Sequence, residues 1–222
     1  MIYPVYVKNY PAPDFNKKEI LRYAGVKEDI LEINALIDEC IKELDGKLKY
    51  KVCYGEYPVK ILGDYVDLTF TSVRSKDLAK NLKNCNDFIL FAATVGIGID
   101  RLIAKYNALS PTKALIFQAI GAERIESLCD LFNNEIKEKY KTVKPRFSAG
   151  YGDLPIEIQK DIFTALNCSK NIGATLNESL LMSPSKSVTA IIGVAKDSDC
   201  ANEKVCAACK KPDCEFRREN EN

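Results

Sequence analysis

The stretch "RFSAGYGDLPIE", from Arg146 to Glu157, combines residue types that could hold a small charged molecule. An arginine can pair with a carboxylate through charge-assisted hydrogen bonds. Ser148 and Ala149 are small enough to let another group approach the backbone, and Gly150 and Gly152 can adopt a positive φ. Such a turn is either a tight connection between two elements or a cradle for a ligand.

Four cysteines near the C-terminal end form a second group that could do chemistry: Cys200, Cys206, Cys209 and Cys214. Soft thiolate ligands suit zinc or an iron–sulfur cluster. The spacing is tighter than in a zinc ribbon, which separates its two cysteine pairs by a dozen or more residues. The alternatives are therefore an iron–sulfur cluster, a zinc ion, or a flexible tail with free thiols.

Composition limits the remaining chemistry. The chain has 222 residues and no histidine, which excludes histidine acid–base catalysis, Ser–His or Cys–His nucleophiles and imidazole metal ligands. The other five of its nine cysteines stand alone in apolar or helical contexts, which is typical of small buried side chains. These are Cys40, Cys53, Cys85, Cys129 and Cys168.

Charge and hydropathy indicate a cytoplasmic protein. A net charge of +1 argues against a nucleic acid or a membrane surface as partner. No apolar run approaches the length of about 18 residues that spans a bilayer, and the first residues do not resemble a signal peptide.

Apolar periodicity and punctuation by Gly and Pro predict an α+β fold, with a mixed or antiparallel central sheet packed against several long helices. We expect Asp14 to cap the first helix, a hairpin to turn at Gly63-Asp64, and Pro111 to separate two helices. Helices are expected over residues 14–24, 27–46, 75–84 and 156–167, with two more split at Pro111 within residues 94–140, and core strands over 86–95 and 187–194. No linker precedes residue 196, so the chain divides into one domain, 1–196, and a Cys-rich tail, 197–222.

The glycines in "GIGIDR" follow a predicted strand and open a helix, as in a phosphate-binding loop. The segment lacks the third glycine of G-x-G-x-x-G and the Lys-Ser/Thr pair of a P-loop. We therefore interpret Gly96 and Gly98 as a strand-to-helix turn.

Two motifs together resemble the activation (reactivation) domain of cobalamin-dependent methionine synthase. Arg146, Gly150 and Tyr151 fit its Arg-x-x-x-Gly-Tyr motif. About two dozen residues later, "NESLLMSPSKSVT" resembles its T-E-S-x-x-M-x-P-x-x-S-V-S-G stretch, and the upstream "AERIESLCDLF" resembles its Ala-Asp/Glu-Arg-Leu/Ile helix. The resemblance covers roughly residues 85 to 195, and the chain looks like the stand-alone form of this domain.

The resemblance implies an S-adenosylmethionine site. Arg146, Ser148, Gly150 and Tyr151 match the motif positions that contact this methyl donor, and two glutamates also line the family's site. Glu138 is the match for one of them, and Glu126 is a shifted match for the other. Arginine, carboxylates and backbone donors suit a sulfonium amino acid.

The implied role is that of an accessory to a methyltransferase rather than a complete enzyme. Without histidine the chain cannot supply the histidine ligand of the cobalt, so the cobalamin would belong to a separate methionine synthase protein. Bound S-adenosylmethionine would methylate that cobalamin after reduction of cob(II)alamin, with the electron coming from flavodoxin, another donor or the cysteine tail. The alternatives are a non-catalytic metal-binding scaffold and an S-adenosylmethionine sensor with a vestigial ligand site.

Overall fold

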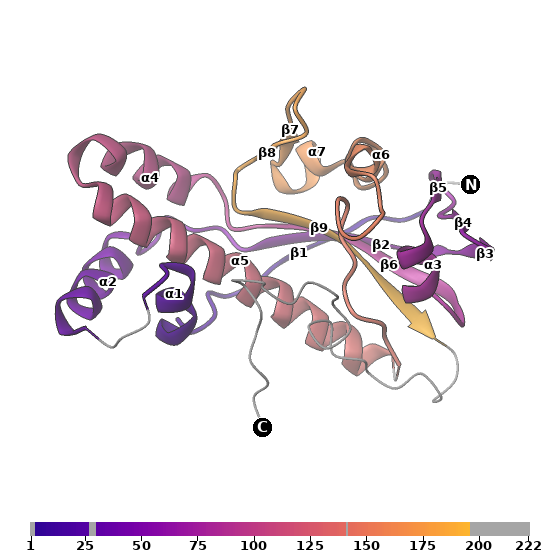
Figure 1. Ribbon diagram of the computed structural model, residues 1–222, viewed down its shortest axis with the longest axis horizontal. Helices are drawn as coiled ribbons and strands as arrows, with labels where there is room; N and C mark the ends of the chain where they lie inside the picture. The colour runs from indigo at the N-terminus through magenta and orange to yellow at the C-terminus, as the bar shows by residue number, and fades with distance from the viewer. Residues whose placement is uncertain (1–2, 27–29, 141, 196–222) are drawn as a thin grey trace.

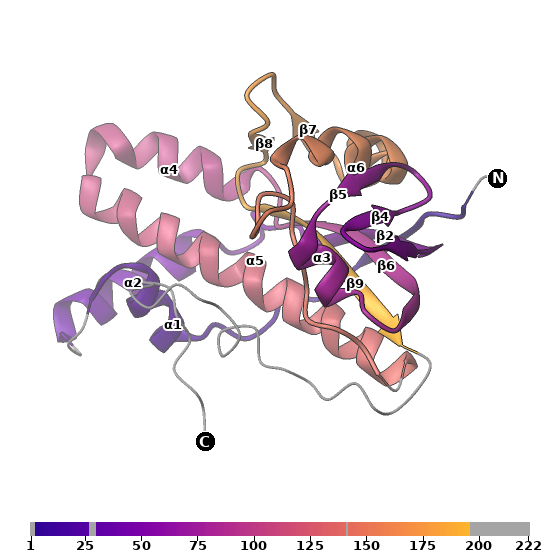
Figure 2. The same ribbon diagram turned by 45° about the vertical axis from the view of Figure 1, so that its right-hand side comes forward.

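The computed structural model describes residues 3–26, 30–140 and 142–195. Among these residues, no helix is both long and apolar enough to cross a membrane. The helices are α1 (Lys17–Tyr23), α2 (Leu31–Glu43), α3 (Lys76–Asn81), α4 (Gly98–Leu109), α5 (Pro111–Lys139), the 3-10 helix η1 (Ile156–Ile158), α6 (Gln159–Leu166) and α7 (Cys168–Ile172). Helices α1, α2 and α4 gather at one end of the molecule, and α3 lies at the other (Figures 1 and 2).

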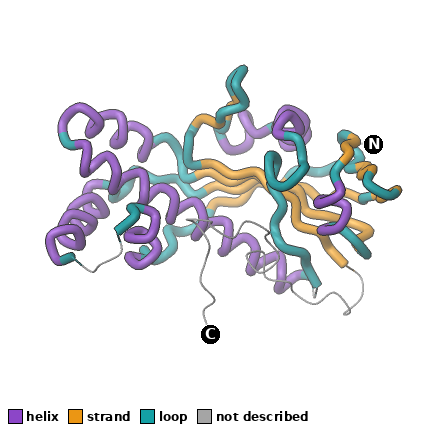
Figure 3. Tube along the Cα trace, in the orientation of Figure 1, coloured by secondary structure: helices purple, strands orange, loops and turns teal. Residues whose placement is uncertain are grey.

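A four-stranded antiparallel sheet in the order β1-β2-β6-β9 runs through the middle of the molecule (Figure 3). Its strands are β1 (Tyr6–Asn9), β2 (Lys51–Pro58), β6 (Cys85–Thr94) and β9 (Ser187–Ala195). Two small sheets are separate from it: β3 (Lys60–Leu62), β4 (Tyr65–Asp67) and β5 (Ser72–Arg74) form one, and β7 (Thr175–Leu176) and β8 (Met182–Ser183) form the other.

Strand β6 of the central sheet is buried on both faces, and the alternation of its side chains shows how. Ile89 and Phe91 pack into a core shared with α1, α2, α4 and α5. Phe88 and Leu90 point the other way, into a core shared with α3, α6 and α7. A strand covered on both faces needs a continuous apolar run, which is why this segment reads "FILFAA".

The predicted α+β class and antiparallel central sheet are confirmed, as are several local signals. The hairpin turns at Gly63-Asp64 between β3 and β4. Ser75 caps α3 by accepting a hydrogen bond from the Leu78 N–H at 3.0 Å, and Ser110 and Pro111 separate α4 from α5. The predicted boundary at residue 196 and the Cys-rich tail lie outside the described residues.

The predicted start of the first helix was wrong. Asn16, not Asp14, caps α1, and its side chain accepts a hydrogen bond from the Glu19 N–H at 3.2 Å. The carbonyl of Asp14 instead accepts a hydrogen bond from Arg124 of α5 at 2.6 Å. This contact spans 110 residues and leaves no local trace in the sequence.

The segment after α5 closes the open edge of the sheet beside β9. Bridges join Val143 to Val194 and Phe147 to Ile191, and the Phe147 and Ile191 backbones exchange hydrogen bonds of 2.9 and 2.8 Å. Because α5 packs on β9 as well, residue 146 is placed between the sheet edge and the side of α5. The sheet thereby fixes the position of the arginine that the sequence singles out.

Candidate ligand site

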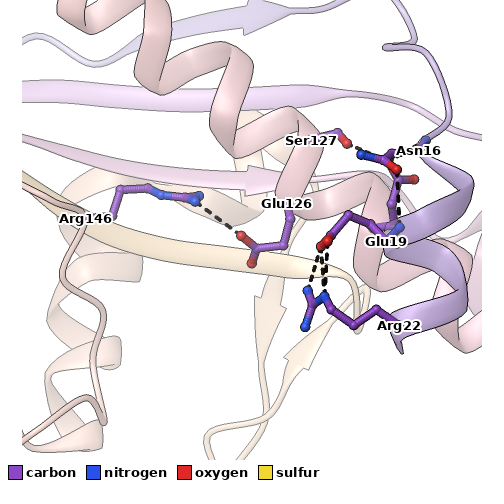
Figure 4. A network of polar contacts seen from close by, with 7 residues as sticks. Asn16, Glu19, Arg22, Glu126, Ser127 and Arg146 are labelled. Carbon is purple, nitrogen blue, oxygen red and sulfur yellow. Dashed lines mark hydrogen bonds and ion pairs between the residues drawn. The ribbon is translucent and has the colours of Figure 1, made fainter. Parts of the chain in front are cut away.

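Arg146 reaches from the sheet edge to two carboxylates on α5. Its Nη2 lies 3.2 Å from Glu126 Oε2 and 2.9 Å from Asp130 Oδ1. Glu126 and Asp130 are four residues apart, so they share one face of the helix. Figure 4 shows Arg146 and Glu126 pointing toward one another from these two elements. The structure therefore brings together Arg146 and Glu126, two of the predicted site residues.

The group around Arg146 has one buried neighbour and three side chains that reach solvent. Cys129, between the two carboxylates in sequence, is fully buried. Burial raises the pKa of its thiol to about 12, although the Arg146 charge acts in the opposite direction. The thiol is therefore neutral at pH 7. The side chains of Arg146, Glu126 and Asp130 are 20%, 33% and 44% exposed, so a ligand can reach this group from solvent.

The turn that follows Arg146 depends on its glycines. Gly150 and Gly152 have φ values of +79° and +56°, in the left-handed region that glycine adopts readily. A Cβ on residue 150 would meet only the Ile156 side chain, at 3.1 Å. A Cβ on residue 152 would lie 2.5 Å from an oxygen of Asp77. Gly152 therefore allows close packing on α3, whereas Gly150 serves mainly the path of the backbone.

Asp153 ties this turn to the start of α3. Its carboxylate accepts hydrogen bonds from the Ser75 hydroxyl, from the Lys76 N–H at 2.8 Å and from the Asp77 N–H at 3.2 Å. The bond from Ser75, followed by those from the backbone, lowers the pKa of Asp153. Residues 146–153 are thus held at both ends, which is what a preformed binding loop requires.

Tyr151 stands at the outer side of the turn with 45% of its surface exposed. Its ring packs edge-on against Phe147, with centroids 5.5 Å apart. Its N–H donates to the Ser148 carbonyl at 3.1 Å, which places Ser148 inside the same turn. An exposed aromatic ring fixed by a neighbour can pack against a flat heteroaromatic group.

Glu138, the other predicted glutamate, lies apart from this group. It is exposed near the end of α5, twelve residues after Glu126, which is about 18 Å along a helix axis. The sequence reasoning did not identify Asp130, which contacts Arg146 instead. Its position four residues after Glu126, on a segment predicted to be helical, was the signal that could have revealed it.

The second motif, residues 177–189, forms the segment that leads into β9. The Asn177 side chain accepts a hydrogen bond from the Leu181 N–H at 2.8 Å, which closes the loop between β7 and β8. The Ser187 hydroxyl lies 2.9 Å from Thr94 Oγ1 on β6 and donates to the Pro184 carbonyl at 2.8 Å. These contacts place the first residues of β9, and they show a structural use for the motif.

The interpretation of Gly96 and Gly98 as a strand-to-helix turn is confirmed. Gly96 has a φ of +81°, and α4 begins at Gly98. A Cβ on residue 98 would collide with the carbonyl oxygen of Lys47. A close approach of backbone, rather than a phosphate, accounts for this glycine.

Two surface hollows lie away from the arginine. One, of about 560 Å³, includes Lys76 and Lys80 of α3, and the other, of about 390 Å³, lies between α6 and β7. Neither is lined by Arg146, Glu126 or Tyr151. The described part of the chain contains no cluster of three or more potential metal ligands. Cys200, Cys206, Cys209 and Cys214 lie outside it.

The chain is similar to known proteins both in sequence and in fold. The family model for the activation domain of vitamin B12-dependent methionine synthase matches residues 130–202, which include Asp130, the Gly-Tyr-Gly turn and the second motif. The resemblance to this activation domain is confirmed. No curated protein matches the chain. Among solved structures, the MetH reactivation domain bound to AdoHcy superposes with a TM-score of 0.64 at 16% identity, covering 90% of this chain and 81% of that one. At this identity the superposition shows a shared fold.

Proposed function

We propose that this activation domain binds S-adenosylmethionine and serves in the reactivation of a cobalamin-dependent methionine synthase. The observation that carries the proposal is the position of Arg146, held between two carboxylates beside a preformed glycine turn. The neighbour of the same fold is bound to AdoHcy, the product that S-adenosylmethionine becomes when it loses its methyl group.

The residues present fit such a ligand. The guanidinium of Arg146 can pair with the amino-acid carboxylate, and the carboxylates of Glu126 and Asp130 can face its ammonium and sulfonium. The exposed ring of Tyr151 can pack against the adenine, while Ser148 and Gly150 keep the backbone accessible. In this proposal none of these residues transfers a proton. Their role is to hold the methyl donor in a fixed orientation.

When bound, S-adenosylmethionine would supply a methyl group for the reduced cobalamin of a methionine synthase. We place that cobalamin outside these 222 residues, because they contain no histidine and so have no imidazole to offer the cobalt. The proposal keeps the cytoplasmic location that the sequence predicts. The electron would come from flavodoxin, from another donor or through the cysteine tail.

Calorimetric titration of the full chain with S-adenosylmethionine tests the binding step. We expect saturable binding to one site per chain, and reactivation of an oxidised cobalamin-dependent methionine synthase when a chemical reductant is supplied. A folded protein that takes up no S-adenosylmethionine at millimolar concentration would show that the proposed function is wrong.

We separately propose that the tail binds zinc or an iron–sulfur cluster through Cys200, Cys206, Cys209 and Cys214. Since residues 3–26, 30–140 and 142–195 hold no candidate metal cluster, a chain ending at Lys196 should carry no metal but keep its fold. Metal analysis and the visible spectrum, after anaerobic purification, distinguish zinc from a cluster. Less than about 0.2 metal ions per full-length chain would exclude a tight thiolate site.

A further inference from the structure

One of the two surface hollows is bordered by unpaired cations. It has a volume of about 560 Å³ and lies between α3 and the hairpin of β3 and β4. Lys76, Lys80 and Lys83 line it, and all three are exposed. Among the described residues, none of the three has an ion-pair partner. The one carboxylate of the lining, Asp64, pairs with Arg74 at 3.7 Å, so the lining has an excess of positive charge.

Between the lysines the lining is apolar. Ile61 and Gly63 of the hairpin face the hollow, and so does Ala79 of α3. Leu62, next to them in the hairpin, is 76% exposed. A surface that combines exposed apolar area with cations suits a peptide segment that carries carboxylates and small apolar side chains.

Strand β9 ends beside this hollow, at the same end of the molecule as α3 (Figure 2). Ala195 pairs with Cys85, and the lining includes the two residues before Cys85. A Cβ on Gly193 would lie within 3.0 Å of the side chains of Leu82, Cys85 and Lys144. The end of β9 therefore packs on the end of α3, and Lys144 extends the basic surface from the hollow to the strand.

Charge is divided unevenly between the domain and the tail. Residues 1–196 contain 27 basic and 24 acidic residues, whereas residues 197–222 contain five basic and seven acidic ones, so the domain is net positive and the tail net negative. Asp197 and Asp199 are the first acidic residues after β9. A zinc ion or an oxidised iron–sulfur core held by four thiolates adds about two further negative charges to the tail.

We propose that the hollow beside α3 binds the metal-loaded Cys-rich tail of the same chain. The inference rests on the proposed metal site of the tail and adds to it the surface on which the tail binds. The chain is long enough: Cys200 can lie up to about 17 Å from Ala195. Lys76 and Lys83 are seven residues apart, which is about 10 Å along a helix axis. Attraction between the lysines and the anionic tail stabilises the contact.

Helix α3 connects this hollow to the Arg146 turn. The Asn81 side chain donates to the carbonyl of Pro145 at 3.2 Å, directly before the arginine. At the other end of the turn, Asp153 accepts a hydrogen bond from the Lys76 N–H at 2.8 Å. Lys76 thus belongs both to the hollow and to the contact that fixes the turn. A bound tail would bring its metal centre to the helix that supports the proposed S-adenosylmethionine site.

Carbodiimide cross-linking of the full chain, purified anaerobically with its metal, tests the contact directly. The reagent joins a carboxylate to an amine where the two touch, and mass spectrometry identifies the pair. We expect Asp197 or Asp199 to be linked to Lys80 or Lys83. The yield should fall about fivefold when salt rises from about 50 to about 500 mM, because salt screens the attraction between exposed charges. Removal of the metal with a chelator should lower it in the same way.

Lys160 and Lys170 provide the internal control. Both are exposed lysines of α6 and α7 and have no ion-pair partner among the described residues. Tail carboxylates should not be linked to them. Equal linkage to these control lysines would show that the tail does not select the hollow, and linkage only between two chains would assign the hollow to a second copy. Either result overturns the inference.

Charge reversal provides a second measurement. Lys80→Glu combined with Lys83→Glu should release the metal to a chelator about tenfold faster, because a repelled tail exposes its thiolates. Lys160→Glu combined with Lys170→Glu is the matched control and should release it at the rate of the unmodified chain. All four lysines are exposed, so both double variants should keep their fold, as circular dichroism can verify.

The outcomes separate the inference from the metal site on which it rests. If the chain holds its metal but both double variants release it at the same rate, the tail binds metal without docking on α3 and the inference is wrong. If the chain holds less than about 0.2 metal ions, the metal site and the inference fail together. Titration with S-adenosylmethionine tests the proposed function independently of both.

Discussion

Two arginines contact carboxylates of the same helix, α5, in opposite environments. Arg124 and its partner Glu123 are 0% and 2% exposed. Arg146 is 20% exposed, and its partners Glu126 and Asp130 are 33% and 44% exposed. The carboxylates of the two pairings lie within one stretch of α5, but only the pairing of Arg146 is exposed enough to meet a ligand.

The buried pairing is saturated by the protein itself. Arg124 donates to both oxygens of Glu123, at 2.6 Å each, and to the carbonyls of Pro13 and Asp14, and its guanidinium lies 3.9 Å from the centroid of the Phe15 ring. The Ser127 hydroxyl donates to Glu123 at 2.7 Å. These contacts fasten the segment before α1 to α5. An ion pair with every polar atom engaged and no exposure is structural.

The open pairing differs in exposure, because Arg146, Glu126 and Asp130 all reach solvent. The difference teaches that an arginine–carboxylate contact indicates a binding site only when a ligand could replace one partner. Arg146 meets that condition, and Arg124 does not. Each of the following substitutions acts on one side of this contrast.

The largest effect on stability is expected from Arg124→Met. The variant leaves the Glu123 carboxylate buried without its cation, so the free energy of unfolding should fall by about 3–5 kcal/mol. Urea unfolding followed by circular dichroism measures it. Arg146→Met is the matched control and should cost no more than about 1 kcal/mol, because its partners remain hydrated. Equal losses for the two variants would remove the distinction between the pairs.

Arg146→Ala should mainly affect binding. We expect the affinity for S-adenosylmethionine to fall by about 2–4 kcal/mol, because the ligand carboxylate loses a charged partner. Arg74→Ala, which removes an exposed arginine paired with Asp64 at 3.7 Å, serves as the control and should bind normally. Calorimetric titration compares the two. An unchanged affinity in Arg146→Ala would remove this arginine from the ligand site.

Gly150→Val should combine a moderate loss of stability with a loss of binding. A branched side chain at a φ of +79° costs about 1–3 kcal/mol and alters the backbone of the turn. Gly63→Val is the control: its φ is +66°, with no heavy atom within 4 Å of an added Cβ, in the hairpin between β3 and β4. Both variants should melt at lower temperature, but only Gly150→Val should weaken binding. Normal binding by Gly150→Val would mean that the turn does not form the cradle.

Local signals in the sequence predicted the parts of the fold that depend on local chemistry. The apolar run of β6, the helix that begins after Ser75 and the break at Pro111 each involve neighbouring residues, and each was confirmed. Strand β2 was not predicted because Gly55 and Pro58 interrupt its β-rich pattern. Its place in the sheet depends on pairing with β1 and β6, which are distant in sequence.

The candidate site likewise has a part that local sequence signals predicted and a part that they did not. The motif located Arg146 and the turn, and the positive φ expected at Gly150 and Gly152 is present. Its partner Asp130 was harder to predict from the sequence. Asp130 lies sixteen residues before Arg146, and the stretch between them includes the end of α5 and the start of the segment at the sheet edge. No local pattern states which turn of a helix will face such a segment. Long-range packing decides it.

Glu138→Gln should have the smallest effect. The resemblance assigns this glutamate to the site, whereas its exposed position, about 18 Å along α5 from Glu126, predicts little contact with a ligand on Arg146. At that separation and in water the charge is screened, so the affinity for S-adenosylmethionine should change by less than about 0.5 kcal/mol. Titration beside Asp130→Asn gives the comparison at equal change of charge. A loss of tenfold or more in Glu138→Gln would mean that ligand binding draws the end of α5 toward the turn, and the open pairing would then extend over the last turns of the helix.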